Sequence, residues 1–213
     1  MAQSDDRRPL SSRDTGWARA IARRLSDSGI TPNQISMASM AMAACAGAAF
    51  WLAGGAPSGP RIALLLAAAL FCQLRLLCNL FDGMVAIEGG KQSADGPFWN
   101  EFPDRIADIL ILAGVGYGIG APALGWAAAG FAVLTAYTRE LGRNCGLPAD
   151  FSGPMAKQHR MAMITAAALI SLLEPFWRGQ GEVLTVALWL IAVGAAVTAL
   201  RRAANIVRGL RGR

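Results

Sequence analysis

Six long apolar segments dominate this chain and limit what it can fold into. A helix needs about 20 apolar residues to cross the hydrocarbon core of a bilayer, and each segment is close to that length. Stretches rich in glycine and proline separate the segments and mark turns. We expect spanning helices at about 34–54, 61–84, 98–119, 122–142, 155–175 and 182–203.

The composition also indicates a membrane protein. Hydrophobic residues make up 54% of the 213 residues, and charged residues make up only 16%, against about 25% in soluble domains. This predicts an all-α integral membrane protein. The net charge is +6, but aromatic residues do not cluster among the basic ones. We therefore expect membrane lipids, and not nucleic acid, as the partner of the basic surface.

The region before the first segment has its own pattern. It shows no apolar core near Met1, so it does not resemble a cleaved signal peptide. Trp17, Ile21 and Leu25 recur every four residues, which favours a short amphipathic juxtamembrane helix in the membrane interface, although a solvated helix could show the same spacing. We expect a cytoplasmic tail with this interfacial helix at 1–30, followed by one six-helix membrane domain at 31–213.

The basic residues predict the orientation. They gather before the first segment, between the second and third, between the fourth and fifth, and after the last. The opposite side holds only Arg61 and Arg178. By the positive-inside rule, both termini face the cytoplasm, as they would in a multi-pass protein of the inner membrane.

Carboxylates and amides cluster where the second and third segments meet. Asn79 and Asp82 are three residues apart, while Asn100, Asp104 and Asp108 are spaced by four, so each set lies on one helix face. Oxygen ligands of this kind suit a hard cation such as Mg²⁺, which often holds phosphates too. Ionisable groups at membrane depth usually mark a site, although any one of these residues alone could be a helix cap or an interfacial polar group.

The stretch from Asn79 to Asp104 resembles the signature of the CDP-alcohol phosphotransferase family, in a divergent bacterial form. That signature is Asp-x2-Asp-Gly-x2-Ala-Arg-x8-Gly-x3-Asp-x3-Asp, and its spacing matches throughout. The positions that match by identity are Asp82, Gly83, Ala86, Gly96 and Asp104. The positions that depart are Asn79 and Asn100, in place of aspartates, and Ile87, in place of arginine.

The resemblance implies a transferase of phospholipid biosynthesis that uses Mg²⁺ or Mn²⁺. Family aspartates hold metal at the first three positions, so Asn79, Asp82 and Asn100 would face metal and diphosphate. Asp104 would be the base, and also a ligand. An asparagine oxygen can ligate Mg²⁺ but carries no charge. Asp108 or Glu101 would have to compensate, and Asp108 is the better candidate because it shares the helix face of Asp104.

The implied reaction releases CMP from a CDP-linked lipid such as CDP-diacylglycerol when a small hydroxyl acceptor attacks phosphorus. Asp82 and Asp104 would be the catalytic pair. The residues expected to face the nucleotide are Gly83, Ala86 and Gly96.

Basic residues flank the predicted loop between the fourth and fifth segments. They are Arg139, Arg143, Lys157 and Arg160. Arginine forks match phosphate oxygens, which favours a phosphorylated acceptor such as glycerol 3-phosphate, but membrane topology alone could place these charges. Arg75, one turn before Asn79, could reach the same site or extend to the membrane surface.

Two further alternatives stay open at the level of sequence. Gly114 and Gly118 could allow close helix contact within the chain or in a homodimer, and the resemblance favours a homodimer. Asn79, Asn100 and Ile87 also fit a non-catalytic membrane protein that binds a nucleotide-lipid or a metal on a decayed site.

Overall fold

The computed structural model describes residues 15–91, 93–177 and 179–212, and these residues form helices joined by short connections. The helices are α1 (Gly16–Asp27), α2 (Pro32–Gly54), α3 (Ser58–Glu88), α4 (Gly96–Gly118), α5 (Pro122–Asn144), α6 (Lys157–Ile170) with the 3₁₀ helix η2 (Ser171–Trp177), and α7 (Glu182–Arg211). The first part of the predicted tail, residues 1–14, lies outside the described residues, as does Arg178.

The predicted all-α class is confirmed, because α2 to α7 fall on the six apolar segments. Four described helical stretches are long and apolar enough to cross a membrane: α2, α3, α6 with η2, and α7. The chain is therefore a multi-pass membrane protein. The count of six spans stays a prediction, since α4 and α5 are not among those four.

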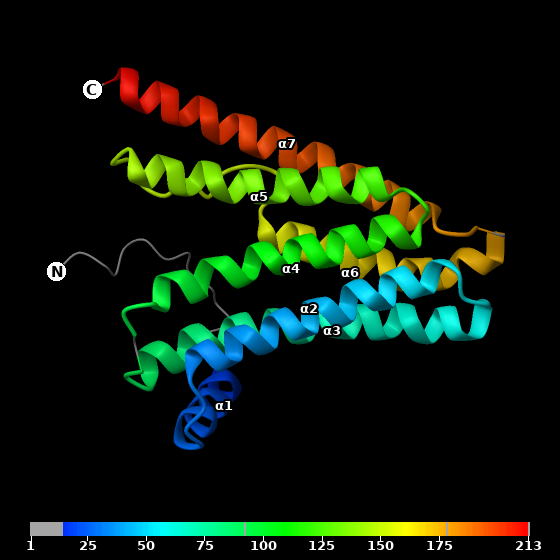
Figure 1. The fold of residues 1–213 in the computed structure, drawn as a ribbon, viewed down its shortest axis with the longest axis horizontal. Helices are drawn as coiled ribbons and strands as arrows, with labels where there is room; N and C mark the ends of the chain where they lie inside the picture. The colour runs from blue at the N-terminus through cyan, green and yellow to red at the C-terminus, as the bar shows by residue number, and fades with distance from the viewer. Residues whose placement is uncertain (1–14, 92, 178, 213) are drawn as a thin grey trace.

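The helices lie side by side, and their connections alternate between two ends of the bundle (Figure 1). One end holds α1, the α3–α4 and α5–α6 connections, and the C-terminal end of α7. We call it the polar end, because Asn79, Asp104 and Lys157 lie towards it. The opposite end, called the far end, carries Arg61 and Glu174. The predicted cytoplasmic residues thus share one end, while the orientation in a membrane stays a prediction.

Helix α1 packs on α3 through alanines. Ala18 and Ala22 are buried in a small cluster with Phe81 and its neighbours. Two residues of the predicted stripe stay on the surface, with Trp17 50% and Ile21 39% exposed, whereas Leu25 packs against the cluster. The Trp17 and Phe81 rings meet edge to face, 6.2 Å apart. A helix that lies in the membrane interface needs exposed apolar side chains of this kind, and the interfacial placement stays a prediction.

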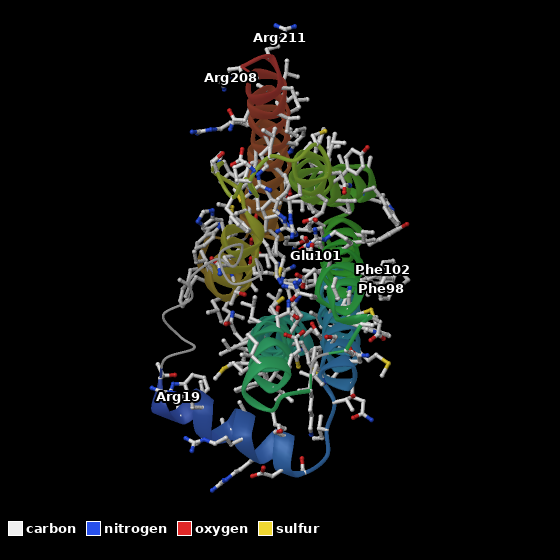
Figure 2. The ribbon with its side chains drawn as sticks, turned by 90° about the vertical axis from the view of Figure 1, so that its left-hand side faces the viewer. Arg19, Phe98, Glu101, Phe102, Arg208 and Arg211 are labelled. Carbon is white, nitrogen blue, oxygen red and sulfur yellow. The ribbon has the colours of Figure 1, made fainter. Side chains whose placement is uncertain are left out.

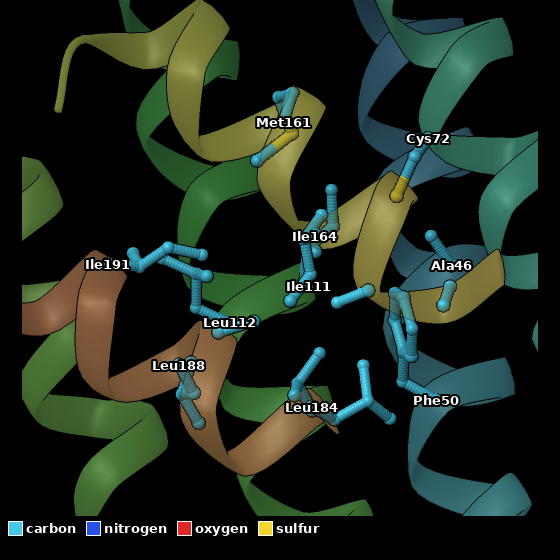
Figure 3. Packing of buried hydrophobic residues seen from close by; sticks show 14 of the residues in the cluster. Ala46, Phe50, Cys72, Ile111, Leu112, Met161, Ile164, Leu184, Leu188 and Ile191 are labelled. Atoms are coloured by element: carbon cyan, nitrogen blue, oxygen red, sulfur yellow. The ribbon is translucent and has the colours of Figure 1, made fainter. Parts of the chain in front are cut away.

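The main core is formed by α2 to α7, to which α5 contributes alanines, and Figure 3 shows part of it from close by. Many members are alanines, which let helices approach closely. The larger side chains at its centre are Phe50, Ile111, Leu112, Met161, Ile164, Leu184, Leu188 and Ile191.

Glycines bring the backbones of α2 and α4 into contact. A Cβ atom on Gly114 would lie 2.3 Å from the carbonyl oxygen of Gly47, and one on Gly118 would lie 2.2 Å from that of Phe50. A Cβ on Gly54 would lie 1.8 Å from the Gly118 oxygen. Only glycine fits at such distances. The structure thus supports the within-chain alternative for Gly114 and Gly118, and the homodimer stays a prediction.

Candidate functional site

The two halves of the signature meet at the polar end of the bundle. Asn79 lies on α3 and Asp104 on α4. The Asn79 side-chain amide donates a hydrogen bond to Oδ1 of Asp104. Figure 2 looks along the bundle from this end and shows nitrogen and oxygen atoms gathered between the helices. In the same view Phe98 and Phe102 project from the outer side of α4, away from that centre.

Two serines of α2 form hydrogen bonds to the signature residues of α3. Ser39 Oγ donates to Asn79 Oδ1 over 2.7 Å, and Ser36 Oγ donates to Asp82 Oδ2 over 2.9 Å. The other oxygen of Asp82 accepts the backbone N–H of Gly83 at 2.6 Å. Both serines are buried. Sequence reasoning missed them, although their spacing of three within an apolar helix was the available signal.

Cations of the protein surround Asp104. Arg75 Nη2 lies 3.0 Å from Oδ1, and Lys157 Nζ, from α6, contacts Oδ2. Arg105 Nη2 lies 3.7 Å from Oδ2. Arg75 is fully buried, which selects the inward alternative left open by the sequence. Its Nε and Nη1 have no hydrogen-bond partner among the described residues.

Asp108 has a different partner, although it lies only one turn beyond Asp104. Its Oδ2 is 2.5 Å from Nη2 of Arg160, and both side chains are buried. Arg160 also donates to the carbonyl oxygen of Met155 at 2.9 Å. This pair joins α4 to α6 and leaves Oδ1 of Asp108 and Nε of Arg160 unpartnered within the described part of the chain.

The two basic residues at the end of α5 contact glutamates. Arg139 lies 2.5 Å from a carboxylate oxygen of Glu101 and 2.9 Å from one of Glu140. Arg143 lies 3.3 Å from Glu140. The four predicted phosphate-binding residues therefore divide: Lys157 and Arg160 reach the aspartates of α4, whereas Arg139 and Arg143 pair nearer the surface.

The connection that leads to Lys157 is held by Asp150. Its carboxylate accepts the N–H of Ser152 and the side-chain amide of Asn205, each at 2.8 Å. Partial burial raises the pKa of Asp150, but these hydrogen bonds and the positive charge of Arg202 outweigh it, so the pKa lies below its ordinary value. Arg202 Nε donates to the Ser152 carbonyl oxygen at 3.0 Å. These contacts fix the connection against α7.

The remaining predicted residues lie along the same two helices. Gly83 and Ala86 are partly buried on α3, and Gly96 begins α4. Asn100 is on α4, one turn before Asp104, and it is exposed. The individual roles given to these residues by the resemblance stay predictions.

The donor set does not fit the divalent-metal centre that the resemblance implies. Across residues 15–91, 93–177 and 179–212, no three His, Cys, Asp or Glu side chains lie close enough together to hold a metal ion. Asp104 and Asp108 pair with cations of the protein. Asn79 brings no charge, and Asn100 is exposed. Of the five predicted ligands, this leaves Asp82 as the carboxylate with no ion pair recorded to it.

Comparison with solved structures identifies the fold. The chain superposes on the crystal structure of Mycobacterium tuberculosis phosphatidylinositol phosphate synthase with CDP-DAG bound, with a TM-score of 0.73 and 20% identity, over 89% of this chain and 92% of that chain. The same synthase in complex with manganese and citrate gives a TM-score of 0.74 and 21% identity, over 89% and 88%. The chain therefore has the fold of this synthase.

Sequence comparison finds several relatives, although no family model matches the chain. A phosphatidylinositol phosphate synthase of Streptomyces avermitilis is 29% identical over 150 residues, which are 63% of this chain and 59% of that protein. The inner membrane protein YnbA of Escherichia coli is 28% identical over 170 residues, 76% of this chain and 77% of that protein.

A third relative is longer. The bifunctional IPC transferase and DIPP synthase of Rubrobacter xylanophilus is 35% identical over 155 residues, 68% of this chain but only 33% of that protein. The chain thus spans less than two thirds of the length of this relative and of the Streptomyces one. Together with the fold, these similarities support the resemblance to CDP-alcohol phosphatidyltransferases.

Proposed function

We propose that this chain transfers a phosphatidyl-type group from a CDP-alcohol to a small hydroxyl acceptor, with release of CMP, in phospholipid biosynthesis. One observation carries the proposal: Asp104 lies between Asn79 of α3 and Lys157 of α6. The carboxylate expected to serve as base therefore touches both the signature that resembles a nucleotide-lipid site and the basic segment expected to bind the acceptor.

The donor is a CDP-linked lipid, by similarity to the synthase crystallised with CDP-DAG bound. The polar end suits such a donor, because acyl chains can stay in the bilayer while the nucleotide reaches the aqueous side. We place this end in the cytoplasm, with the protein in the inner membrane as YnbA is. The membrane domain at 31–213 would work as a homodimer, as the resemblance implies.

In the reaction, the acceptor hydroxyl oxygen forms a bond to the lipid-side phosphorus as the bond from that phosphorus to the CMP oxygen breaks. CMP leaves, and the hydroxyl proton passes to a carboxylate oxygen of Asp104. In the free protein, Arg75 and Lys157 pair with that carboxylate. A phosphate group on the acceptor offers Lys157 another partner, and the release of Lys157 exposes an oxygen of Asp104 to the hydroxyl.

The acceptor is a phosphorylated polyol. Lys157 is partly exposed at the site and can bind phosphate as a point charge. The sequence suggests glycerol 3-phosphate, and the names of two relatives suggest a phosphorylated inositol. Arg139 and Arg143 would guide the anionic acceptor towards the site.

The dependence on Mg²⁺ or Mn²⁺ stays a prediction from the resemblance. The synthase of the same fold binds manganese. The donor set of this chain does not fit such a centre, so we assign the steps of the reaction to the protein's own residues.

The test is release of CMP by the purified protein in detergent, supplied with CDP-diacylglycerol and a panel of acceptors that includes glycerol 3-phosphate and inositol phosphate. Each acceptor is assayed with Mg²⁺, with Mn²⁺ and with a chelator. Acceptor-dependent release is expected. No release with any acceptor, while a related synthase works alongside, would contradict the proposal.

The second candidate is binding of a nucleotide-lipid without turnover. It is favoured by the ion pairs on Asp104, because a carboxylate held by two cations is a weak base. Binding of CDP-diacylglycerol without CMP release under every condition would select it.

A further inference from the structure

We infer that Arg75 and Lys157, and not divalent cations, supply the positive charge that faces the diphosphate at this site. The inference concerns how the site is neutralised, and it rests on the proposed function only for the identity of the anion. It follows from the hydrogen bonds of Asn79, the ion pairs of Asp104 and the unpartnered donors of Arg75.

The contact between Asn79 and Asp104 needs no metal. The Asn79 amide nitrogen donates to Asp104, while its oxygen accepts from Ser39. An ionised carboxylate at position 79 could not donate to Asp104, so two carboxylates in contact would need a cation or a shared proton between them. Asparagine instead makes this contact directly, through its own N–H donor. The substitution that removes a metal ligand thus also removes the need for the metal.

Cations of the protein already offset the carboxylates of the site. Asp82 and Asp104 carry the negative charge, and Arg75 and Lys157 carry the positive charge. Arg105 lies slightly farther from Asp104, at 3.7 Å. A divalent cation on Asp104 would have to displace or approach these fixed cations, and repulsion between like charges at such short range is costly in a partly buried site. The residues therefore oppose metal binding at Asp104.

Arg75 is left with donors that an anion could use. Its side chain is fully buried beside Asp104, and a guanidinium presents donors on three nitrogens. Nη2 binds Asp104, but Nε and Nη1 have no partner among the described residues. Buried donors without partners are rare, and a bound ion is one of the groups that can satisfy them. Lys157 is partly exposed and can turn from Asp104 to an incoming phosphate.

The first arm of the test measures metal binding alone. The full chain in lipid nanodiscs is titrated with Mn²⁺ and followed by electron paramagnetic resonance. We expect the spectrum of free Mn²⁺ throughout the titration for the wild type. A variant that combines Asn79→Asp, Asn100→Asp and Lys157→Gln restores the carboxylates and removes the ammonium group, and we expect it to gain bound Mn²⁺. Stoichiometric Mn²⁺ binding by the wild type would overturn the inference, whether or not the variant folds.

The second arm measures CDP binding by calorimetry, in chelator and in Mn²⁺. We expect equal wild-type affinity in both buffers, and a loss of roughly tenfold or more in Lys157→Gln, as for removal of a charged hydrogen bond. Arg211→Gln removes one positive charge from the exposed end of α7 and is the matched control, with unchanged affinity expected.

The outcomes separate this inference from the proposed function. CDP binding only in the presence of Mn²⁺ contradicts the inference and leaves the proposed function standing. No CDP binding in either buffer contradicts the proposed function, while free Mn²⁺ in the first arm still supports a site neutralised by the protein's own cations.

Discussion

The two ends of the bundle each contain a buried ion pair, but the pairs differ in how completely they are satisfied. At the far end, Glu174 is fully buried and lies 2.5 Å from Arg61. Its two oxygens also accept the backbone N–H groups of Gly181 and Val183, at 2.9 and 3.0 Å. This carboxylate is surrounded by donors that all belong to the protein, so the pair is closed.

At the polar end the carboxylates also have cationic partners, but the hydrogen bonding is incomplete, so the pair is open. Asp104 shares two cations, and the guanidinium of Arg75 retains unpartnered donors within the described structure. Lys157 is partly exposed and reaches the site from a third helix. A buried charge is therefore not by itself evidence of function. Hydrogen-bond donors that have no partner within the protein are the better indication of a binding site.

The largest effect should come from removing the Asp104 carboxylate at the polar end. Asp104→Asn should lower CMP release by roughly a thousandfold, equivalent to about 4 kcal/mol, because the proton of the acceptor hydroxyl loses its base. Asp95→Asn removes an exposed carboxylate at the start of α4 and serves as the control with near-normal turnover. Equal turnover by both variants would remove Asp104 from the mechanism.

Breaking the closed pair should affect stability instead of turnover. Glu174→Leu leaves Arg61 without its carboxylate and should lower the free energy of unfolding by about 3 kcal/mol, as for other broken buried pairs. Denaturation in detergent measures this loss. The folded fraction should bind CDP as the wild type does, and a parallel loss of CDP affinity would show that the two ends are not independent.

A smaller loss is expected from the helix contact near the far end. Gly118→Ala places a methyl group 2.2 Å from the carbonyl oxygen of Phe50, so α2 and α4 must separate, at a cost of about 2 kcal/mol. Gly130→Ala is the control, because a Cβ there meets no atom within 4 Å. Thermal unfolding of the two variants tests the contact, and equal melting temperatures would refute it.

The smallest effect on stability is expected at Asp150, in the α5–α6 connection at the polar end. Its folded pKa is lowered, so its contribution to stability is present above the unfolded pKa and is lost as the pH falls through the folded pKa. Asp150→Asn should be slightly less stable than the wild type at neutral pH, and the difference should vanish in acid. A difference that grows in acid would contradict the direction of this shift.

The sequence predicted the helices well, because apolar length and turn residues act locally. Thr31, for example, forms a capping box with Gln34 at the start of α2. Composition does not decide whether α4 and α5 cross the membrane, because charged residues fill part of the first half of α4 and the last turns of α5. The helix that packs against Gly114 could not be predicted either, because small residues allow close contact with any helix. The structure shows that this helix is α2.

The site was predicted in part. Spacing placed Asn79 and Asp104 on helix faces that do meet. Spacing alone could not show that Asp104 and Asp108 take different partners, because the partners come from other helices: Asp104 meets Arg75 of α3 and Lys157 of α6, and Asp108 meets Arg160 of α6. The direction of Arg75 was equally beyond the sequence, since a long side chain can turn inward or extend to the surface.

The most direct measurement is an experimental structure of the full chain with CDP-diacylglycerol bound. We predict that the diphosphate contacts Arg75 and Lys157, that Lys157 has moved away from Asp104, and that the Arg61–Glu174 pair is unchanged. A diphosphate bound away from Arg75 and Lys157, or held through divalent cations between Asp82 and Asp104, would contradict the account.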